Sequence, residues 1–132
     1  MADADIKALR RIAAFSDLPD TVLQRVAQRV TWRRVEAGEI IFHEGDAVDA
    51  IHLLHSGRVK VVTVSPDGRE QLLHLLEPGA VFPRVGFFHG HHYPATAWMD
   101  EPGVLGILRK ASLRELVRED GDAAAALFGM ME

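Results

Sequence analysis

The chain has 132 residues, of which 48% are hydrophobic and 26% are charged, and its formal net charge is −4. This length and balance fit one soluble domain with a hydrophobic core of its own. The chain contains no cysteine, which excludes disulfides, cysteine-ligated zinc and iron–sulfur clusters held by cysteine. The only notable basic clusters are Arg10–Arg11 and Arg33–Arg34, so we expect no direct contact with nucleic acid.

The first residues do not form a signal peptide, because they include acids and lack an apolar segment. No apolar run approaches the roughly 18 residues needed to span a membrane. We therefore expect a cytoplasmic protein that does not bind membranes.

Residues 1–30 are predicted to be helical. Ile6, Leu9 and Ile12 recur at helical spacing, and Pro19 and Asp20 suit the start of a second helix. The apolar stripe of this second helix is predicted at Val22, Leu23, Val26, Ala27 and Val30.

Residues 31–110 are predicted to form a β-roll. Turn signals centred on glycine follow one another quickly, and short apolar runs lie between them. Short strands with frequent turns are typical of a sandwich or barrel. The turn SPDG predicts a tight hairpin, since proline presets φ and glycine accepts a positive φ. The predicted strands are residues 40–42, 50–54, 58–64, 71–76, 95–99 and 104–108.

Residues 111–132 are predicted to contain a closing helix and the start of another. Ser112 and Glu115 match the capping box S-x-x-E. Asp122 is predicted to cap the last helix, whose apolar Leu127 and Phe128 need a partner surface. We therefore expect either a longer natural chain or pairing with a second copy.

Three pieces of sequence between Leu9 and Val117 carry a resemblance to a known family. They are FSDLPDTVLQRVAQRVTWRRVEAGEIIFHEGD, AIHLLHSGRVKVVTVSPDGREQLLHLLEPGAVF, and GFFHGHHYPATAWM with the later ILRKASLREL. The pieces resemble the effector domain of Crp/Fnr-type bacterial transcription regulators, and YPATA is most similar to the nitric-oxide-responsive and related anaerobic branch. The resemblance implies a mainly β fold with helices at both ends, a double-stranded β-helix (jelly roll) of the cyclic-nucleotide-binding-domain type. It also implies that Gly38, Gly45, Gly57 and Gly68 serve tight turns where a Cβ would clash.

The resemblance implies a sensory function for residues 1–132 as a single effector-sensing domain. The expected partners are an unidentified small-molecule effector and a second copy in a homodimer. DNA would be bound only through a helix-turn-helix domain that this chain does not contain.

The family pocket is altered in this chain. In members that bind cyclic nucleotides, a glycine and a glutamate follow an aromatic residue, and an arginine and a small residue begin the next strand. Here Phe82 keeps the aromatic position, Pro83 and Arg84 replace the glycine and glutamate, and Pro94 and Ala95 take the later pair. A guanidinium only donates, whereas the carboxylate accepts from the ribose, and proline offers no charge. We therefore expect no micromolar binding of cyclic AMP or cyclic GMP.

The predicted effector pocket contains nine residues: Phe82, Pro83, Arg84, Val85, Gly86, Tyr93, Pro94, Ala95 and Thr96. Arg84 could hold the carboxylate or phosphate of a different effector. It could equally form a salt bridge with Asp100 or Glu101.

The motif HGHH brings His89, His91 and His92 close together and raises the question of a metal site. H-x-H can place two imidazoles on one metal, as in cupins, but no histidine follows His92 and no carboxylate follows before Asp100. We therefore predict no metal site and interpret HGHH as a hairpin tip, which makes a cupin-like protein a weaker alternative. Haem on another histidine is a minor alternative that no motif marks.

The remaining alternative is a stand-alone β-roll that acts as an interaction module with a degenerate pocket. An enzyme is not predicted, because the chain shows no paired carboxylates, no G-x-S-x-G and no phosphate-binding loop.

Overall fold

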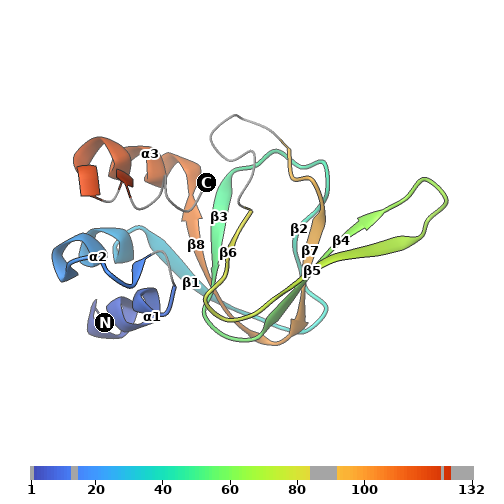
Figure 1. The fold of residues 1–132 in the computed structure, drawn as a ribbon, viewed down its shortest axis with the longest axis horizontal. Coiled ribbons are helices and arrows are strands. Elements are labelled where there is room, and N and C mark those ends of the chain that lie inside the picture. The colour runs from blue at the N-terminus through green and yellow to red at the C-terminus, as the bar shows by residue number, and fades with distance from the viewer. Residues whose placement is uncertain (1, 13–14, 84–91, 123, 126–132) are drawn as a thin grey trace.

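The computed structural model describes residues 2–12, 15–83, 92–122 and 124–125. Two four-stranded sheets face each other, with helices gathered at one end (Figure 1). The strand order is β1-β8-β3-β6 in one sheet and β2-β7-β4-β5 in the other. The elements are α1 (Ala2–Arg10), α2 (Asp20–Ala27), β1 (Val30–Val35), β2 (Ile40–Phe42), β3 (Ala50–Leu54), β4 (Arg58–Val64), β5 (Glu70–Leu76), β6 (Val81–Phe82), β7 (Thr96–Glu101), β8 (Gly103–Arg109) and α3 (Lys110–Glu119).

The predicted fold class, a mainly β jelly roll with flanking helices, is confirmed. All strand pairs that are described are antiparallel. The predicted strands 40–42, 50–54 and 58–64 agree with β2, β3 and β4, and the others differ by one or two residues at their ends. Strands β1 and β6 were not predicted as strands. Strand β1 pairs with β8, and strand β6 pairs with β3. Because each partner is distant in the chain, this pairing leaves little signal in the local sequence.

The SPDG turn forms the predicted hairpin between β4 and β5. The Ser65 amide donates to the Arg69 carbonyl at 2.9 Å, and the Gly68 amide donates to the Ser65 carbonyl at 2.9 Å. Gly68 has a φ of +84°. This hairpin extends away from the body of the roll (Figure 1).

The predicted steric reason for the turn glycines is correct at one position of the four. A Cβ on Gly57 would lie 2.7 Å from the Glu101 carbonyl oxygen. At Gly38, Gly45 and Gly68 a Cβ would meet nothing within 4 Å. Those three residues are glycines because their φ angles are positive, which L-residues rarely adopt.

Three predictions of helix boundaries are wrong. Val30 begins β1 instead of extending the apolar stripe of α2, which ends at Ala27. Ser112 does not cap α3, because β8 runs directly into the helix at Lys110, whose amide donates to the Asp49 carbonyl at 2.7 Å. Asp122 is itself helical, and its amide donates to Asp120 Oδ1 at 3.0 Å, so Asp120 takes the capping position.

One hydrophobic core joins the roll to the helices. Strand β3 is buried along its whole length, because β8 and β6 flank it within its sheet. Leu9, Leu23 and Leu116 bring the three helices into the same core and are fully buried. Within the described part of the chain, no helix is both long and apolar enough to cross a membrane.

Candidate functional site

The two halves of the predicted effector pocket meet beneath the β4–β5 hairpin. Phe82 ends β6 and Pro83 follows it through a cis peptide bond, while Pro94 and Ala95 lead into β7. These four residues line one cavity of about 420 Å³. Arg84, Val85 and Gly86 lie outside the described residues.

The other two described members of the predicted pocket do not line this cavity. Thr96 Oγ1 accepts a hydrogen bond from the Glu44 amide at 2.9 Å, so its side chain binds the turn that follows β2. Tyr93 is buried, and its ring stacks on Phe42 with 3.8 Å between ring centroids.

Sequence reasoning missed the residues that the sheets contribute to the cavity. Strands β2, β4, β5 and β6 add these lining side chains: Phe42, Val61, Leu73, His74, Leu76 and Val81. Of the described lining residues, only His74 carries a polar side chain. The alternating pattern of β4 could have predicted that Val61 faces inward, but no local signal brings β5 to the same space.

The described lining offers a cyclic phosphate little to bind. A phosphate needs charge-assisted donors such as an arginine fork or several backbone amides. Among the described lining residues, the histidine at position 74 is the one side chain able to donate. The lining instead suits an apolar molecule.

His52 does not line this cavity, but it belongs to a buried aromatic cluster with Phe42 and Phe82, which do. Its ring centroid lies 5.3 Å from that of Phe82 and 5.5 Å from that of Phe42. The residue is 6% exposed, and its Nδ1 has no hydrogen-bond partner among the described residues. Burial lowers the pKa of His52 from its ordinary 6.5 to about 4, because a charged imidazolium loses its hydration there.

Tyr93 links this cluster to the start of β3. Its hydroxyl lies 3.3 Å from both Asp49 Oδ1 and the Ala50 carbonyl oxygen, and can donate to either. Burial and, to a smaller degree, the negative charge of Asp49 raise the pKa of Tyr93 to about 12. The phenol therefore stays protonated and keeps this bond at physiological pH.

The carboxylates predicted as partners of Arg84 are already paired. Arg58 Nε donates to Asp100 Oδ2 at 2.7 Å, and Arg58 Nη2 lies 3.2 Å from Glu101 Oε1. Arg84 itself lies outside the described residues, so its role remains a prediction.

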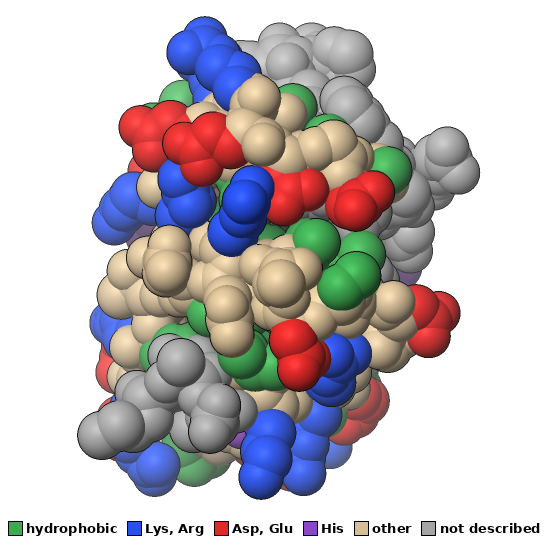
Figure 2. All heavy atoms as spheres, turned by 90° about the vertical axis from the view of Figure 1, so that its left-hand side faces the viewer, with side chains coloured by type: hydrophobic (Ala, Val, Ile, Leu, Met, Phe, Trp, Pro, Cys, Tyr) green, Lys and Arg blue, Asp and Glu red, His purple; other side chains and the backbone are tan. Residues whose placement is uncertain are grey.

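The arginine clusters form ion pairs as well. Arg10 pairs with Asp20, Arg33 with Glu39, and Arg34 with Glu36. On the helical end of the molecule, basic and acidic side chains are interspersed (Figure 2).

The histidines do not form a shared site in the described part of the chain. No group of three or more metal-ligating side chains is present among the residues that the structure places. His92 is exposed and bridges Ala47 through its backbone, while His89 and His91 lie outside the described residues. His52 and His55 contact different aromatic residues, Phe82 and Trp32.

The comparison with known protein families decides the classification of this chain. Residues 32–120 match the family described as cyclic nucleotide-binding domain. The chain belongs to the cyclic nucleotide-binding domain family.

Two curated relatives match parts of this chain. An uncharacterized NTE family protein of Mycobacterium tuberculosis, Rv2565, is 39% identical over 61 residues, which is 46% of this chain and 10% of the relative. A CRP-like cAMP-activated global transcriptional regulator of the same species is 28% identical over 80 residues, or 61% of this chain and 36% of the relative. The chain thus spans only about a tenth to a third of the length of these relatives.

Solved structures match over nearly the whole chain. The sensor domain of the transcriptional regulator DNR from Pseudomonas aeruginosa has a TM-score of 0.82 and 22% identity, covering 97% of this chain and 86% of that one. The N-terminal domain of a transcriptional regulator from Streptomyces coelicolor has a TM-score of 0.81 and 27% identity, covering 93% and 88%. These findings confirm the predicted resemblance to Crp/Fnr-type effector domains.

Proposed function

We propose that this domain is the effector-sensing module of a Crp/Fnr-type transcription regulator and that its effector is a small, largely apolar molecule. The observation that carries the proposal is the cavity of about 420 Å³ beneath the β4–β5 hairpin, whose described lining is apolar apart from His74. The relatives named as transcriptional regulators support the regulatory part of the proposal.

The cavity is placed where binding can act on neighbouring elements. Phe82 and Pro83 lie on one side of it, at the end of β6, and Pro94 and Ala95 lie on the other, before β7. An occupant would contact both segments and Leu73 of the β4–β5 hairpin. An effector acts allosterically when it binds one arrangement of these segments more tightly than another.

Cyclic AMP and cyclic GMP are expected not to bind with micromolar affinity. Pro94 stands where the family's phosphate-binding arginine would lie, and the described lining has no arginine or lysine to replace it. Isothermal titration calorimetry with each nucleotide should give no saturation at micromolar concentration. Saturation in this range would contradict the altered-pocket part of the proposal.

An uncharged apolar probe is expected to bind the cavity instead. N-phenyl-1-naphthylamine should bind with one saturable site, seen as increased fluorescence. Leu73→Arg should weaken the probe by about tenfold, since a charge enters the apolar lining. Leu72→Arg is the matched control, because Leu72 is also exposed on β5 but does not line the cavity. Equal weakening by both substitutions would show that the probe binds elsewhere on the hairpin.

We also propose that the domain forms a homodimer, because β5 exposes several apolar side chains. Leu72, Leu73 and Leu75 are 42% to 50% exposed on this edge strand. Edge strands with apolar side chains readily pair with another chain. The same strip favours a second candidate function, an interaction module for a different protein.

Light scattering after size-exclusion chromatography separates these two functions. A dimer mass that Leu72→Glu together with Leu75→Glu converts to a monomer mass would support self-association through β5. A monomer mass for the unaltered chain would favour the interaction module.

A further inference from the structure

The sheet β2-β7-β4-β5 has one face turned toward the core and one face turned away from it. Val59, Ala97 and Met99 are buried in the hydrophobic core. Successive side chains of a strand point to opposite faces of its sheet. Lys60 and Trp98, their neighbours in sequence, therefore lie on the outer face.

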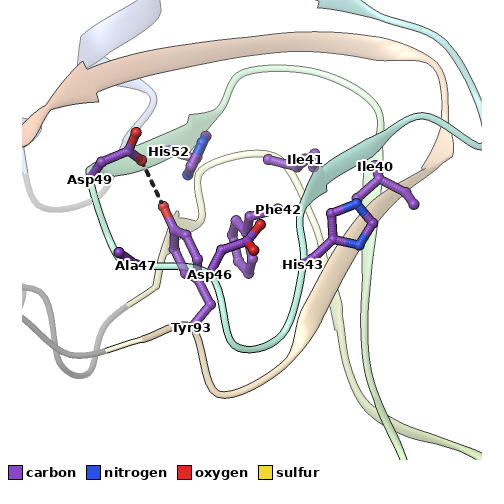
Figure 3. A pocket seen from close by; sticks show the side chains of 9 residues that line it. All are labelled: Ile40, Ile41, Phe42, His43, Asp46, Ala47, Asp49, His52 and Tyr93. Atoms are coloured by element: carbon purple, nitrogen blue, oxygen red, sulfur yellow. Dashed lines mark hydrogen bonds between the residues drawn. The ribbon is translucent and has the colours of Figure 1, made fainter.

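One row of side chains crosses all four strands of this outer face. Trp98 pairs with Ile40 on one side and with Lys60 on the other, and Lys60 pairs with Leu75. Residues paired across neighbouring strands share a face of the sheet. Figure 3 shows the Ile40 side chain on the other side of β2 from the Phe42 ring, which belongs to the core.

The β4–β5 hairpin continues the outer face beyond the end of β7. Alternation along β4 places Val62 and Val64 on the same face as Lys60, and their partners on β5 are Leu72 and Glu70. The hairpin projects from the body of the roll (Figure 1). Two strands alone are only marginally stable in water, so contact with another molecule would stabilise this arm.

Most of the exposed large apolar side chains gather on this face. Val62 is buried, but four of the five large hydrophobic residues that are exposed in the described part of the chain lie here, at 46% to 52% exposure: Ile40, Val64, Leu72 and Leu75. An antiparallel sheet usually presents polar side chains to water. An exposed apolar face instead indicates a contact with another molecule.

Two charges on the outer face have no partner of opposite sign. Lys60 Nζ lies 5.9 Å from the centroid of the Trp98 ring, and neither Lys60 nor Glu70 forms an ion pair with a described residue. Glu70 lies opposite Val64, four residues along β4 from Lys60. Strand rise and strand spacing then put the two Cα atoms about 14 Å apart, too far for an ion pair within one copy.

A second copy related by a twofold axis would bring these charges together. Such an interface repeats each contact, because the same patch of both subunits is used. With the axis between the two faces and over the pair Val62 and Leu72, Lys60 of each copy lies over Glu70 of the partner subunit. Glu70 is one strand to the side of Lys60, and the crossing of about 30° that is usual for packed sheets accounts for this offset.

We propose that this outer face binds the same face of a second copy, with Lys60 of each copy paired with Glu70 of the partner subunit and the apolar row covered between them. The inference rests on the homodimer proposed above and names its interface. A second copy is the occupant that fits, because it satisfies both charges of the face at once. Pairing through the backbone edge of β5 would leave Lys60, on the inner strand β4, without contact to the partner.

Charge reversal tests the pairing in the whole chain. Lys60→Glu and Glu70→Lys should each weaken the dimer by about tenfold or more, since like charges would meet at two symmetric positions. Sedimentation equilibrium measures the dissociation constant of the dimer. An equimolar mixture of the two variants should recover the affinity of the unaltered chain, because both contacts of the mixed dimer then join opposite charges.

Lys7→Glu on α1 is the matched control. It makes the same change of charge at an exposed position outside this sheet, so it should leave the dissociation constant unchanged. Recovery of affinity in the mixture would exclude misfolding as the cause of the losses in Lys60→Glu and Glu70→Lys.

The other outcomes separate this interface from the function proposed above. A dimer that tolerates both charge reversals would overturn the interface and leave a homodimer through the β5 edge in place. Two weakened variants that do not recover when mixed would overturn the pairing of Lys60 with Glu70. A monomer mass for the unaltered chain would overturn the interface together with the homodimer and would leave the face to a different partner, while the binding of the apolar probe would be unaffected.

Discussion

Gly103→Ala is expected to unfold the domain or to destabilise it by about 4 kcal/mol or more, the range of the most disruptive single substitutions. Gly103 begins β8, and its backbone lies against the turn that joins β3 to β4. A Cβ at this position would lie 2.0 Å from the Ser56 carbonyl oxygen and 2.6 Å from the Gly57 amide nitrogen. Backbone atoms cannot move aside as a side chain can, so the two turns would have to separate.

That separation would break a set of hydrogen bonds. The Val104 amide donates to the Ser56 carbonyl at 3.2 Å and to Ser56 Oγ at 3.0 Å, and the His55 amide donates to the Val104 carbonyl at 3.0 Å. Urea unfolding followed by circular dichroism measures the loss. Gly68→Ala is the control: its Cβ would meet no atom within 4 Å, so only the strain of a positive φ remains, about 1–2 kcal/mol. Similar losses in the two variants would contradict the predicted clash.

The stability of the domain is expected to fall as the pH is lowered from 6.5 to 4, with His52 contributing about 3 kcal/mol of that fall. Burial lowers the pKa of His52 to about 4 in the folded chain, while the unfolded chain keeps the ordinary value of 6.5. Between these values the unfolded chain binds a proton that the folded chain does not. Protonation therefore favours unfolding as the pH falls, and the full contribution of His52 is present above pH 6.5.

The variant His52→Phe isolates this contribution. Phenylalanine keeps an aromatic ring between Phe42 and Phe82 but cannot titrate. The free energy of unfolding, measured in urea at pH 7, 5.5 and 4, should fall about 3 kcal/mol less in the variant than in the unaltered chain. Parallel curves for the two proteins would show that His52 takes up a proton in the folded state as easily as in the unfolded one.

Much of the roll could be predicted because its signals are local. The runs at residues 40–42, 50–54 and 58–64 stand between glycines that adopt positive φ, so sequence and structure agree on β2, β3 and β4. The SPDG turn is equally local, since four residues determine its geometry. The helix boundaries were less predictable, because tertiary contacts decided them, as where Lys110 bonds to the Asp49 carbonyl at the start of α3.

The candidate site was predictable only in part. Phe82, Pro83, Pro94 and Ala95 could be assigned to one cavity because the family resemblance places them together, and the structure brings all four to its lining. Thr96, which was also predicted for the pocket, accepts a hydrogen bond from the Glu44 amide in the turn after β2. Tyr93 lines a different, smaller cavity, which shares Phe42 with the larger one.

The sequence alone determined the class of fold, the positions of most strands along the chain and the absence of cysteine chemistry. These features depend on composition and on neighbouring residues. Only the tertiary structure decided that Leu73 of β5 reaches the larger cavity and that His52, a polar residue in an apolar strand, is buried with an unmet nitrogen. The reason is physical: a cavity lies between strands that are distant in the chain, so its lining and its electrostatics arise only when the two sheets pack together.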